Sequence, residues 1–228
     1  KYQTGGVKGR RIQDSTFLIH LLLQYQKQQE RGGFIVSLDN TKAFDNVNRK
    51  YLFHVLRKYG FSEKTINVIE KFYKNNVSRV IINGFLSEKF KVENGIRQGC
   101  PLSAMLYVLA VEPLSICILK AIHMQGFVLP NNMEMKLVQH VDDVTLFLKN
   151  EESIVFAIKC IKLFGEISGS ILNKKKSFII KIGQSNEAYT IEEIPVLKNT
   201  FRLQMVGNIM KQIFDGEYRK ILGIYFCA

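Results

Sequence analysis

Apolar residues recur every three or four positions in several segments of the chain, which is the spacing of a helix with one buried face. Ser62 can cap the predicted helix at residues 63–73, Gly60 can end the one before it, and Pro101 fits the first turn of the helix that begins there. The helices that this spacing predicts span residues 11–29, 47–56, 63–73, 101–122 and 151–168.

Short apolar runs rich in β-branched residues alternate with these helices and predict strands. Two of the runs flank Asp142 and Asp143 and predict a β-hairpin, whereas residues 184–219 favour neither element. This mixed order of helices and mostly antiparallel strands favours an α+β fold, with a ferredoxin-like antiparallel sheet packed on helices. The predicted strands span residues 34–38, 79–82, 89–92, 135–140, 144–148, 177–182 and 221–226.

The chain has 228 residues, enough for one large domain or two small ones and for a sizeable buried core. Hydrophobic residues make up 46% and charged residues 23%, a globular composition that excludes a disordered chain. Lys and Arg number 32 against 20 Asp and Glu, which gives a formal net charge of +12. Such a surplus predicts attraction to a polyanion, most often nucleic acid, although an anionic membrane surface or plain solubility would also account for it.

The cysteines are too far apart in the sequence to suggest a metal site. They form no C-x-x-C pair and have no His at zinc spacing. Reduced thiols in an intracellular protein are the favoured interpretation, with a nuclear or cytoplasmic location left open. The four positions are Cys100, Cys117, Cys160 and Cys227.

The sequence predicts neither a membrane span nor a secretory signal. The longest apolar stretch, residues 102–111, stops at Glu112 and Pro113 and is shorter than a bilayer requires. The N-terminal residues lack an apolar signal core, so we expect no membrane partner. Because the chain begins at Lys1 without Met and ends on an apolar tetrapeptide, we expect a fragment of a longer protein.

Carboxylates stand where predicted strands end. Asp39 follows the apolar run 34–38, and Asp142 and Asp143 lie between the two strands of the predicted hairpin. Clustered carboxylates repel one another unless a cation lies between them, and such hard oxygen ligands suit Mg²⁺ together with substrate phosphates. Two such ions would activate an attacking oxygen and stabilise the leaving one in phosphoryl transfer.

Each acidic position also has an ordinary structural interpretation. Asp39 could cap a helix that follows it, and Asp142 and Asp143 could be turn residues of the hairpin. Taken together these interpretations weaken, because a tight hairpin usually takes Gly or Asn and two adjacent Asp residues repel each other.

Six blocks of sequence, in the right order and covering nearly the whole chain, resemble those of reverse transcriptases, particularly of non-LTR (LINE-type) retrotransposons. A single Asp-Asp box would be weak evidence for this family, but the ordered set of six blocks is specific to it. His140 stands where the family usually has Tyr or Phe, Val141 where Ala is commoner, and Gly6 where Phe is usual. The blocks are Q-T-G-G-V-K-G-R (3–10), F-I-V-S-L-D-N-T-K-A-F-D (34–45), N-G-I-R-Q-G-C-P-L-S (94–103), H-V-D-D (140–143), S-G-S-I-L-N-K-K-K-S (168–177) and I-L-G (221–223).

The resemblance implies a polymerase site. Asp39, Asp142 and Asp143 would be the catalytic residues and metal ligands, and the backbone carbonyl of Asn40 would complete the shell of one ion. The implied cofactor is a pair of Mg²⁺ ions, with Mn²⁺ as an alternative. In the implied reaction, a primer 3′-hydroxyl attacks the α-phosphate of a deoxynucleoside triphosphate.

The resemblance also implies nucleotide-binding residues. Phe44 matches the bulky residue that excludes a ribose 2′-hydroxyl, and Gln98 and Gly99 match the loop that lies against the incoming nucleotide. Lys176 would lie near the triphosphate, as a proton donor to the leaving pyrophosphate. Without the family, Phe44 fits a core aromatic on a helix, the loop fits a polar lead into a Pro-started helix, and Lys176 fits a solvated charge run.

An RNA template and a DNA primer are the partners that the resemblance implies. Base pairing with the template would determine which nucleotide is added, so the basic residues need only bind the sugar-phosphate backbones, in a salt-dependent way. The candidates for this binding are Lys8, Arg10, Arg11, Lys174 and Lys175.

By resemblance the chain, residues 1–228, covers the fingers–palm region of such an enzyme. Partial fingers, at residues 1–33 and 60–100, would be interleaved with the palm. The N-terminal fingers segment, with its Arg-Pro-Ile signature, would precede Lys1, and the thumb would follow Ala228.

These observations together predict a fragment of an RNA-directed DNA polymerase that works by two-metal nucleotidyl transfer. The alternative is a catalytically inactive nucleic-acid-binding remnant of the same fold, although a pure binder gains nothing from carboxylates that face phosphates. A two-metal nuclease would share the ions but would give no role to Phe44, Gln98 or Gly99.

Overall fold

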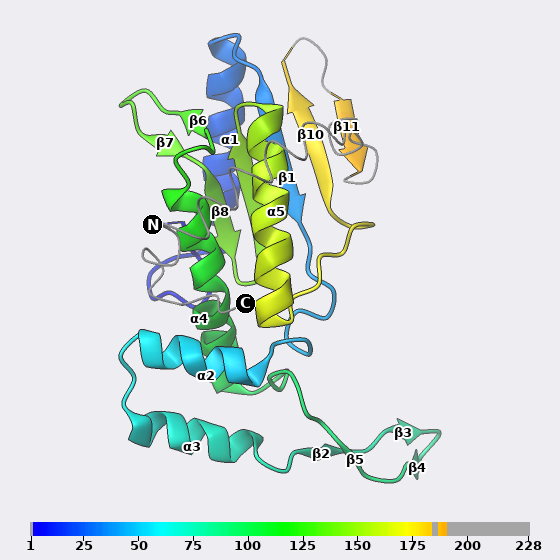
Figure 1. The fold of residues 1–228 in the computed structure, drawn as a ribbon. Coiled ribbons are helices and arrows are strands. Elements are labelled where there is room, and N and C mark those ends of the chain that lie inside the picture. Colours follow the sequence, from blue (N-terminus) through cyan, green and yellow to red (C-terminus); the bar gives the residue numbers. More distant parts are fainter. Residues whose placement is uncertain (1, 184–186, 191–228) are drawn as a thin grey trace.

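The computed structural model describes residues 2–183 and 187–190, and Figure 1 shows helices packed on a single main sheet. The five predicted helices are confirmed in this part of the chain, with ends shifted by at most two residues. The predicted strand at residues 221–226 lies outside the described residues. The helices are α1 (Ile12–Gln28), α2 (Arg49–Lys58), α3 (Glu63–Tyr73), α4 (Pro101–Lys120) and α5 (Glu151–Ser168).

The main sheet is antiparallel throughout and runs in the order β11-β10-β1-β9-β8. Four of its strands, β1, β8, β9 and β10, follow one another in the chain as strand, helices, two strands, helix, strand, and they lie in the spatial order 4-1-3-2. This is the ferredoxin-like, split βαβ arrangement that the sequence predicted. The strands are β1 (Gly33–Leu38), β8 (Leu137–His140), β9 (Asp143–Leu148), β10 (Phe178–Ile182) and β11 (Glu187–Thr190).

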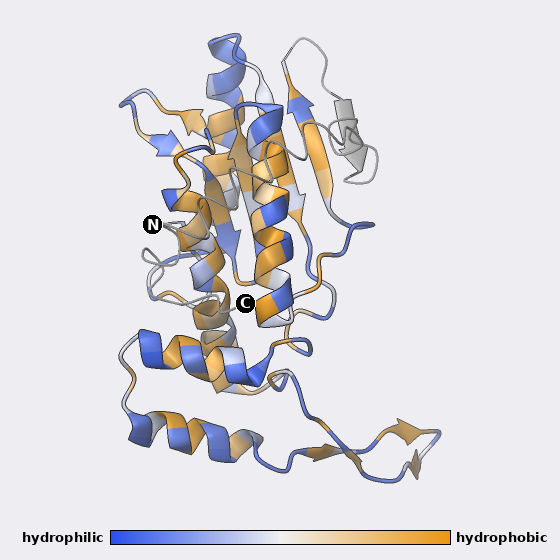
Figure 2. Cartoon of the chain, viewed as in Figure 1, coloured by the Kyte–Doolittle hydropathy of each residue, from blue (hydrophilic) through white to orange (hydrophobic). Residues whose placement is uncertain are grey.

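The two faces of the sheet are covered by different helices. Val36 and Leu38 of β1 pack into the larger core with α4 and α5, whereas Ile35 packs into a smaller core with Phe147 of β9 and Leu22 of α1. Figure 2 shows the apolar faces of α4 and α5 beside the sheet. Because successive residues of a strand point to opposite faces, β1 is apolar at nearly every position.

Helix α4 lies between α2, α5 and β8 and supplies much of the larger core. It continues through Glu112 and Pro113, as the helix predicted at residues 101–122 does. Among the described helices, α4 alone is long and apolar enough by composition to cross a membrane. Its buried residues contact the rest of the domain, which is the ordinary place of a core helix.

Three of the predicted thiols lie within the described residues, and none of the three forms a disulfide bond there. Cys117 and Cys160 are buried between α4 and α5, with their sulfur atoms 3.9 Å apart. Cys100 is exposed just before α4, and Cys227 lies outside the described residues.

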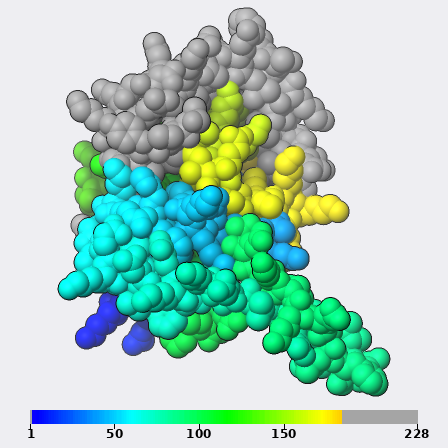
Figure 3. Space-filling model, turned by 60° about the horizontal axis from the view of Figure 1, so that its bottom comes forward, coloured from blue at the N-terminus to red at the C-terminus, as the bar shows by residue number. Residues whose placement is uncertain are grey.

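Residues 74–94 project from the end of α3 as an extended segment, here called the arm (Figures 1 and 3). It contains two short antiparallel pairs in place of the two longer strands predicted at 79–82 and 89–92. Both the N–H of Val80 and the carbonyl of Val80 are bonded to Ser87, which interrupts the ladder between the pairs. The pairs are β2 (Val77–Ser78) with β5 (Phe90–Lys91), and β3 (Ile81–Ile82) with β4 (Phe85–Leu86).

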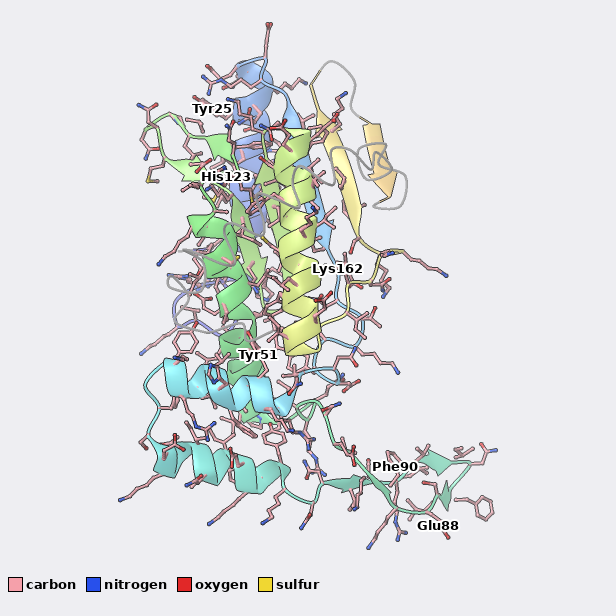
Figure 4. The ribbon with its side chains drawn as sticks, in the orientation of Figure 1. Tyr25, Tyr51, Glu88, Phe90, His123 and Lys162 are labelled. Carbon is pink, nitrogen blue, oxygen red and sulfur yellow. The ribbon has the colours of Figure 1, made fainter. Side chains whose placement is uncertain are left out.

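The tip of the arm turns at Asn83 and Gly84, whose φ angles are 50° and 84°. Two consecutive positive φ angles are what a type I′ hairpin turn requires, and Asn-Gly is its preferred sequence. Apolar side chains such as that of Phe85 are exposed there. The short strands of the arm are coloured as hydrophobic in Figure 2, and Figure 4 shows Glu88 and Phe90 standing clear of the helices.

The strand predicted at residues 135–140 divides in two. Its first part forms β7 (Glu134–Met135), which pairs with β6 (Phe127–Val128), and its second part is β8. Lys136 separates them: its buried ammonium group donates to the Ala121 carbonyl at 2.7 Å and lies 3.2 Å from the Glu134 carboxylate.

Arg49, in the first turn of α2, fixes the base of the arm. Its guanidinium group donates to the carbonyls of Tyr73, Val92, Asn94 and Gly95 at 2.8–3.2 Å. The same group lies 5.1 Å from the centre of the Tyr73 ring, within cation–π range. One side chain therefore joins α2, α3 and both ends of the arm.

Arg49→Met is expected to lower the free energy of unfolding by about 2–3 kcal/mol, because four carbonyls lose a charged donor. Arg57→Met is the matched control, since Arg57 forms ion pairs with Glu63 and Glu70 on the surface and its loss should cost much less than the loss of Arg49. Thermal denaturation followed by circular dichroism measures both values. Equal losses in the two variants would contradict the role given to Arg49.

Candidate active site

Asp39 lies at the end of β1, beside the start of β9. The last registered pair of these strands is Leu38 with Val144, so the next position along β1 is opposite Asp143. The Asp39 N–H donates to the Ser177 hydroxyl at 3.0 Å, and its carbonyl accepts from the Asn173 N–H at 2.8 Å. Both of its backbone groups are thereby fixed.

The interpretation of Asp39 as a helix cap is wrong. Residues 41–46 form turns, and the next helix, α2, begins only at Arg49. Its cap is Asn48, whose side chain accepts from the N–H groups of Lys50 and Tyr51. No capping duty therefore accounts for the Asp39 carboxylate.

Asp142 and Asp143 lie at the tight turn between β8 and β9. His140 pairs with Asp143, so Val141 and Asp142 are the two loop residues. Val141 has a φ of 56°, and a positive φ at the first central position is the requirement of a type II′ turn, where Gly is usual. The turn interpretation of these residues therefore holds, and it places their carboxylates at the same sheet edge as Asp39.

The three carboxylates influence one another electrostatically. Partial burial raises the pKa of Asp143, and the charges of Asp142 and then Asp39 raise it further, while His140 lowers it. The pKa of Tyr107 is raised by burial and by the charges of Asp142 and Asp143, although a hydrogen bond with Asn40 opposes that rise. Repulsion of this kind is expected of carboxylates that share a site without a cation.

The acidic residues at this end of the sheet are of the type that binds a divalent cation, although they are not grouped as a metal site. Within residues 2–183 and 187–190, no three His, Cys, Asp or Glu side chains are grouped closely enough to hold a metal ion. The donors that Asp39, Asp142 and Asp143 offer are hard carboxylate oxygens, which Mg²⁺ prefers.

Phe44 lies near this edge, in the turns that follow Asp39. The alternative interpretation, that Phe44 is a core aromatic on a helix, is therefore wrong about the helix. It is half-buried and stacks on Tyr107 of α4, with ring centroids 4.7 Å apart and planes at 21°. Because Tyr107 interacts with Asp142 and Asn40, the stacked pair connects Phe44 to the carboxylates. Tyr107 was not among the predicted residues, and its sequence signal is that of an ordinary core aromatic on α4.

The loop before α4 is joined to the Phe44 segment. The N–H of Ile96 donates to the Phe44 carbonyl at 2.9 Å, and the Gln98 side chain donates to the Asp45 carboxylate at 3.4 Å. Gly99 is exposed and has a φ of 80°, which suits Gly. The structure therefore brings Gln98 and Gly99 to the same side of the domain as Phe44.

Lys174, Lys175 and Lys176 are exposed in the turn between α5 and β10. Asn173 on one side of them and Ser177 on the other are the residues bonded to Asp39. The preceding segment also touches the site, because the Ser170 hydroxyl donates to the Asn40 side chain at 3.0 Å. The lysine turn is therefore anchored beside the carboxylates.

The basic residues near the N-terminus have different surroundings. Lys8 and Arg11 are exposed, and Arg11 immediately precedes α1. Arg10 instead turns back on its own segment, where its guanidinium donates to the Gln3 carbonyl. Gln3 forms a parallel bridge with Gln139 of β8, so this segment runs alongside the strand that leads to Asp142.

A sequence family described as reverse transcriptase (RNA-dependent DNA polymerase) matches residues 1–221 of the chain. The transposon TX1 uncharacterized 149 kDa protein of Xenopus laevis is 34% identical over 176 residues, which cover 77% of this chain and 13% of that protein. The Pol polyprotein from the type-2 retrotransposable element R2DM of Drosophila melanogaster is 26% identical over 85% of this chain and 19% of its own length. A Pol polyprotein from the type-1 element R2 of Popillia japonica is 27% identical over 93% of this chain and 29% of its own length. The chain thus spans less than a third of each of these relatives.

Solved structures of telomerase share the fold. Telomerase from Candida tropicalis in complex with a TWJ fragment of telomeric RNA aligns with a TM-score of 0.59 at 14% identity, over 82% of this chain and 31% of that one. Apo telomerase from the same organism, truncated from its C-terminal domain, aligns with a TM-score of 0.55 at 16% identity, over 83% of this chain and 38% of that one. At such identities the likeness concerns the fold alone.

Proposed function

The chain belongs to the reverse transcriptase (RNA-dependent DNA polymerase) family, and we propose that it forms the nucleotide-adding site of an enzyme that copies RNA into DNA. The observation that carries this proposal is the placement of Asp39, Asp142 and Asp143 at the adjoining ends of β1 and β9. Their coupled electrostatics support a shared site for cations. We assign the main sheet with α4 and α5 to the palm.

In this proposal Asp39, Asp142 and Asp143 hold two divalent cations, Mg²⁺ or in its place Mn²⁺, and the carbonyl of Asn40 adds a further oxygen. The bound ions would activate the primer 3′-hydroxyl and offset the charge of the leaving pyrophosphate. The chain itself contributes position: β1 and the β8–β9 turn hold the ligands on two bonded strands, which limits their movement.

The nucleotide would lie over the surface formed by Phe44 and the loop of Gln98 and Gly99. Phe44 is held by its stacking on Tyr107, which supports the role that we give its ring in excluding a 2′-hydroxyl. Lys176 lies in the turn anchored beside Asp39, within the region where a triphosphate would meet the cations. A lysine there supplies positive charge and a proton for the leaving group.

We assign the grip on the RNA template and DNA primer to the basic residues on either side of the site. The exposed set is Lys8 and Arg11 at one edge and Lys174 and Lys175 at the other, and the net charge of +12 favours any polyanion. Arg10 contributes less directly, because its guanidinium is bonded to the Gln3 carbonyl. Contacts of this kind predict binding that weakens steeply as salt concentration rises.

The test is extension of a labelled DNA primer on an RNA template by the complete protein, with deoxynucleoside triphosphates and Mg²⁺. We expect product on the RNA template that disappears with EDTA and returns when excess Mg²⁺ or Mn²⁺ is added. No extension under any divalent cation, from protein that is folded by circular dichroism, would refute the proposal.

A second candidate function is nucleic-acid binding without catalysis. The finding that favours it is that no three His, Cys, Asp or Glu side chains in the described part of the chain are grouped so that they could hold a metal ion. A gel-shift assay on the same primer and template distinguishes the two: a remnant would bind the duplex with a salt-dependent affinity and extend nothing.

A further inference from the structure

The turn that carries Asp142 has a costly backbone conformation at Val141. With a φ of 56°, Val141 lies in the left-handed region, where a β-branched side chain is a genuine outlier. The other described non-glycine residues with positive φ are all Asn, Glu or Lys. A conformation of this kind persists only where the surrounding structure holds it in place.

Buried glutamine side chains hold both backbone polar groups of Val141. Its N–H donates to Gln3 Oε1 at 3.1 Å, and its carbonyl accepts from Gln139 Nε2 at 2.9 Å. Gln3 is 4% exposed and Gln139 is fully buried. Because one comes from the N-terminal segment and the other from β8, they hold the turn from two sides. We call Gln3 and Gln139 the glutamine clamp.

Each glutamine of the clamp is itself fixed by further bonds. Gln3 Oε1 also accepts from the Gly5 N–H at 2.8 Å, and Gln139 Oε1 accepts from the Ser115 hydroxyl on α4. The backbones of the two residues form a bridge, in which the Gln139 N–H donates to the Tyr2 carbonyl at 2.9 Å. The clamp therefore ties the turn to the core helix and to the N-terminal segment.

Residues beside Gln3 close the remaining space around the turn. A Cβ atom at Gly5 would lie 2.6 Å from the backbone nitrogen of Val141, closer than real Cβ contacts allow. The Thr4 hydroxyl lies 3.0 Å from Nδ1 of His140. The turn thus has little room to take another backbone conformation.

We propose that the glutamine clamp sets the position of Asp142 and Asp143, which makes Gln3 and Gln139 positioning residues for nucleotide addition. This inference rests on the proposed function. The relevant property of Gln3 is its acceptor oxygen: within the described part of the chain, its Nε2 has no hydrogen-bond partner, whereas Oε1 accepts two bonds. An apolar side chain of equal length would fill the same space without holding Val141.

Gln3→Met keeps the length and removes the acceptor. We expect kcat for deoxynucleotide addition to fall by about 10–100-fold, because small displacements of reacting groups are costly. The KM for the nucleotide should change by less than about threefold, since no nucleotide contact is removed. Amide hydrogen exchange at Val141, followed by nuclear magnetic resonance, should speed up by about tenfold or more.

Gln26→Met is the matched control. Gln26 is 2% exposed, as buried as Gln3, but it lies in α1 near the first residues of β1, at the opposite end of that strand from the turn. This variant should leave kcat and Val141 exchange unchanged. Unchanged Val141 exchange in Gln3→Met, or equal acceleration in Gln26→Met, would overturn the clamp.

A second variant separates positioning from general stability. Val141→Gly removes the cost of the positive φ, so Gln3→Met should lower kcat by less than about threefold in that background. The same loss in both backgrounds would overturn the proposed role. If the unaltered protein adds no nucleotide at all, the proposed function fails, while the exchange measurements still decide whether the clamp holds the turn.

Discussion

Asp142→Asn together with Asp143→Asn is expected to reduce primer extension by about 1,000-fold or more, beyond the loss from removing a single stabilising group. Both carboxylates lie at the β8–β9 turn, and Asn offers a neutral amide in place of an anionic oxygen ligand. Asp39→Asn, on the neighbouring strand, should cause a loss of the same order because it belongs to the same site.

The same double substitution should not destabilise the fold. Burial and the charges of Asp142 and Asp39 raise the pKa of Asp143, so its ionised form costs stability at every pH above that raised pKa. The cost disappears as pH falls through the folded-state pKa, because the proton then binds more tightly to the folded chain than to the unfolded one. Neutral Asn removes the cost at pH 7, so the melting temperature in EDTA should stay equal or rise by up to about 4 °C.

Glu151→Gln together with Glu152→Gln is the matched control, since it removes two adjacent acidic charges in the first turn of α5. Those positions follow β9 at its far end, so primer extension should stay within about twofold of the unaltered protein. Product formation and melting temperature are measured on all variants. Equal extension by the Asp142→Asn/Asp143→Asn variant and the control would end the assignment of catalysis to these carboxylates.

Local patterns sufficed to predict the elements that build the site. The apolar runs at residues 34–38 and 144–148 are properties of single strands, and pairing them places Asp39 opposite Asp143. The ferredoxin-like topology then follows from the order of helices and strands along the chain.

Errors arose where a distant contact decides the local structure. The interpretation of Phe44 as a core aromatic placed it on a helix, but hydrogen bonds from the loop at 94–98 hold its segment in turns. The strand at 135–140 breaks where the buried Lys136 turns toward Ala121 at the end of α4.

Contacts between distant positions explain what sequence reasoning missed at the site. Gln3 and Val141 are 138 positions apart, and the roles of Gln139 and Tyr107 appear only when the turn is packed against α4. The sequence does not distinguish a buried glutamine from an exposed one, so its hydrogen-bond partners can be identified only in the three-dimensional structure. The same is true of Arg49, whose four carbonyl partners come from α3, from the arm and from Gly95, the residue that follows the arm.

Phe44→Ala is expected to lower the preference for deoxynucleotides over ribonucleotides by about 10–100-fold, the range that a single hydrophobic contact commonly sets. The ring is half-buried and fixed by stacking on Tyr107, next to Asn40 and the carboxylate edge. Its removal would open space where a 2′-hydroxyl would otherwise collide. Because the effect is steric, kcat/KM for ribonucleotides should rise while that for deoxynucleotides falls only modestly.

Single-nucleotide incorporation, with each triphosphate in turn, measures the two kcat/KM values. Phe53→Ala is the matched control: Phe53 is also half-buried and packs against the same core, but it lies on α2. That variant should lower stability comparably without altering nucleotide preference, because the lost ring is part of the packing and not of the nucleotide surface. Phe44→Leu should retain most of the discrimination, since it keeps apolar bulk at the same position. A preference that is unchanged in Phe44→Ala, or that falls equally in Phe53→Ala, would show that Phe44 is a packing residue and that sugar selection lies elsewhere.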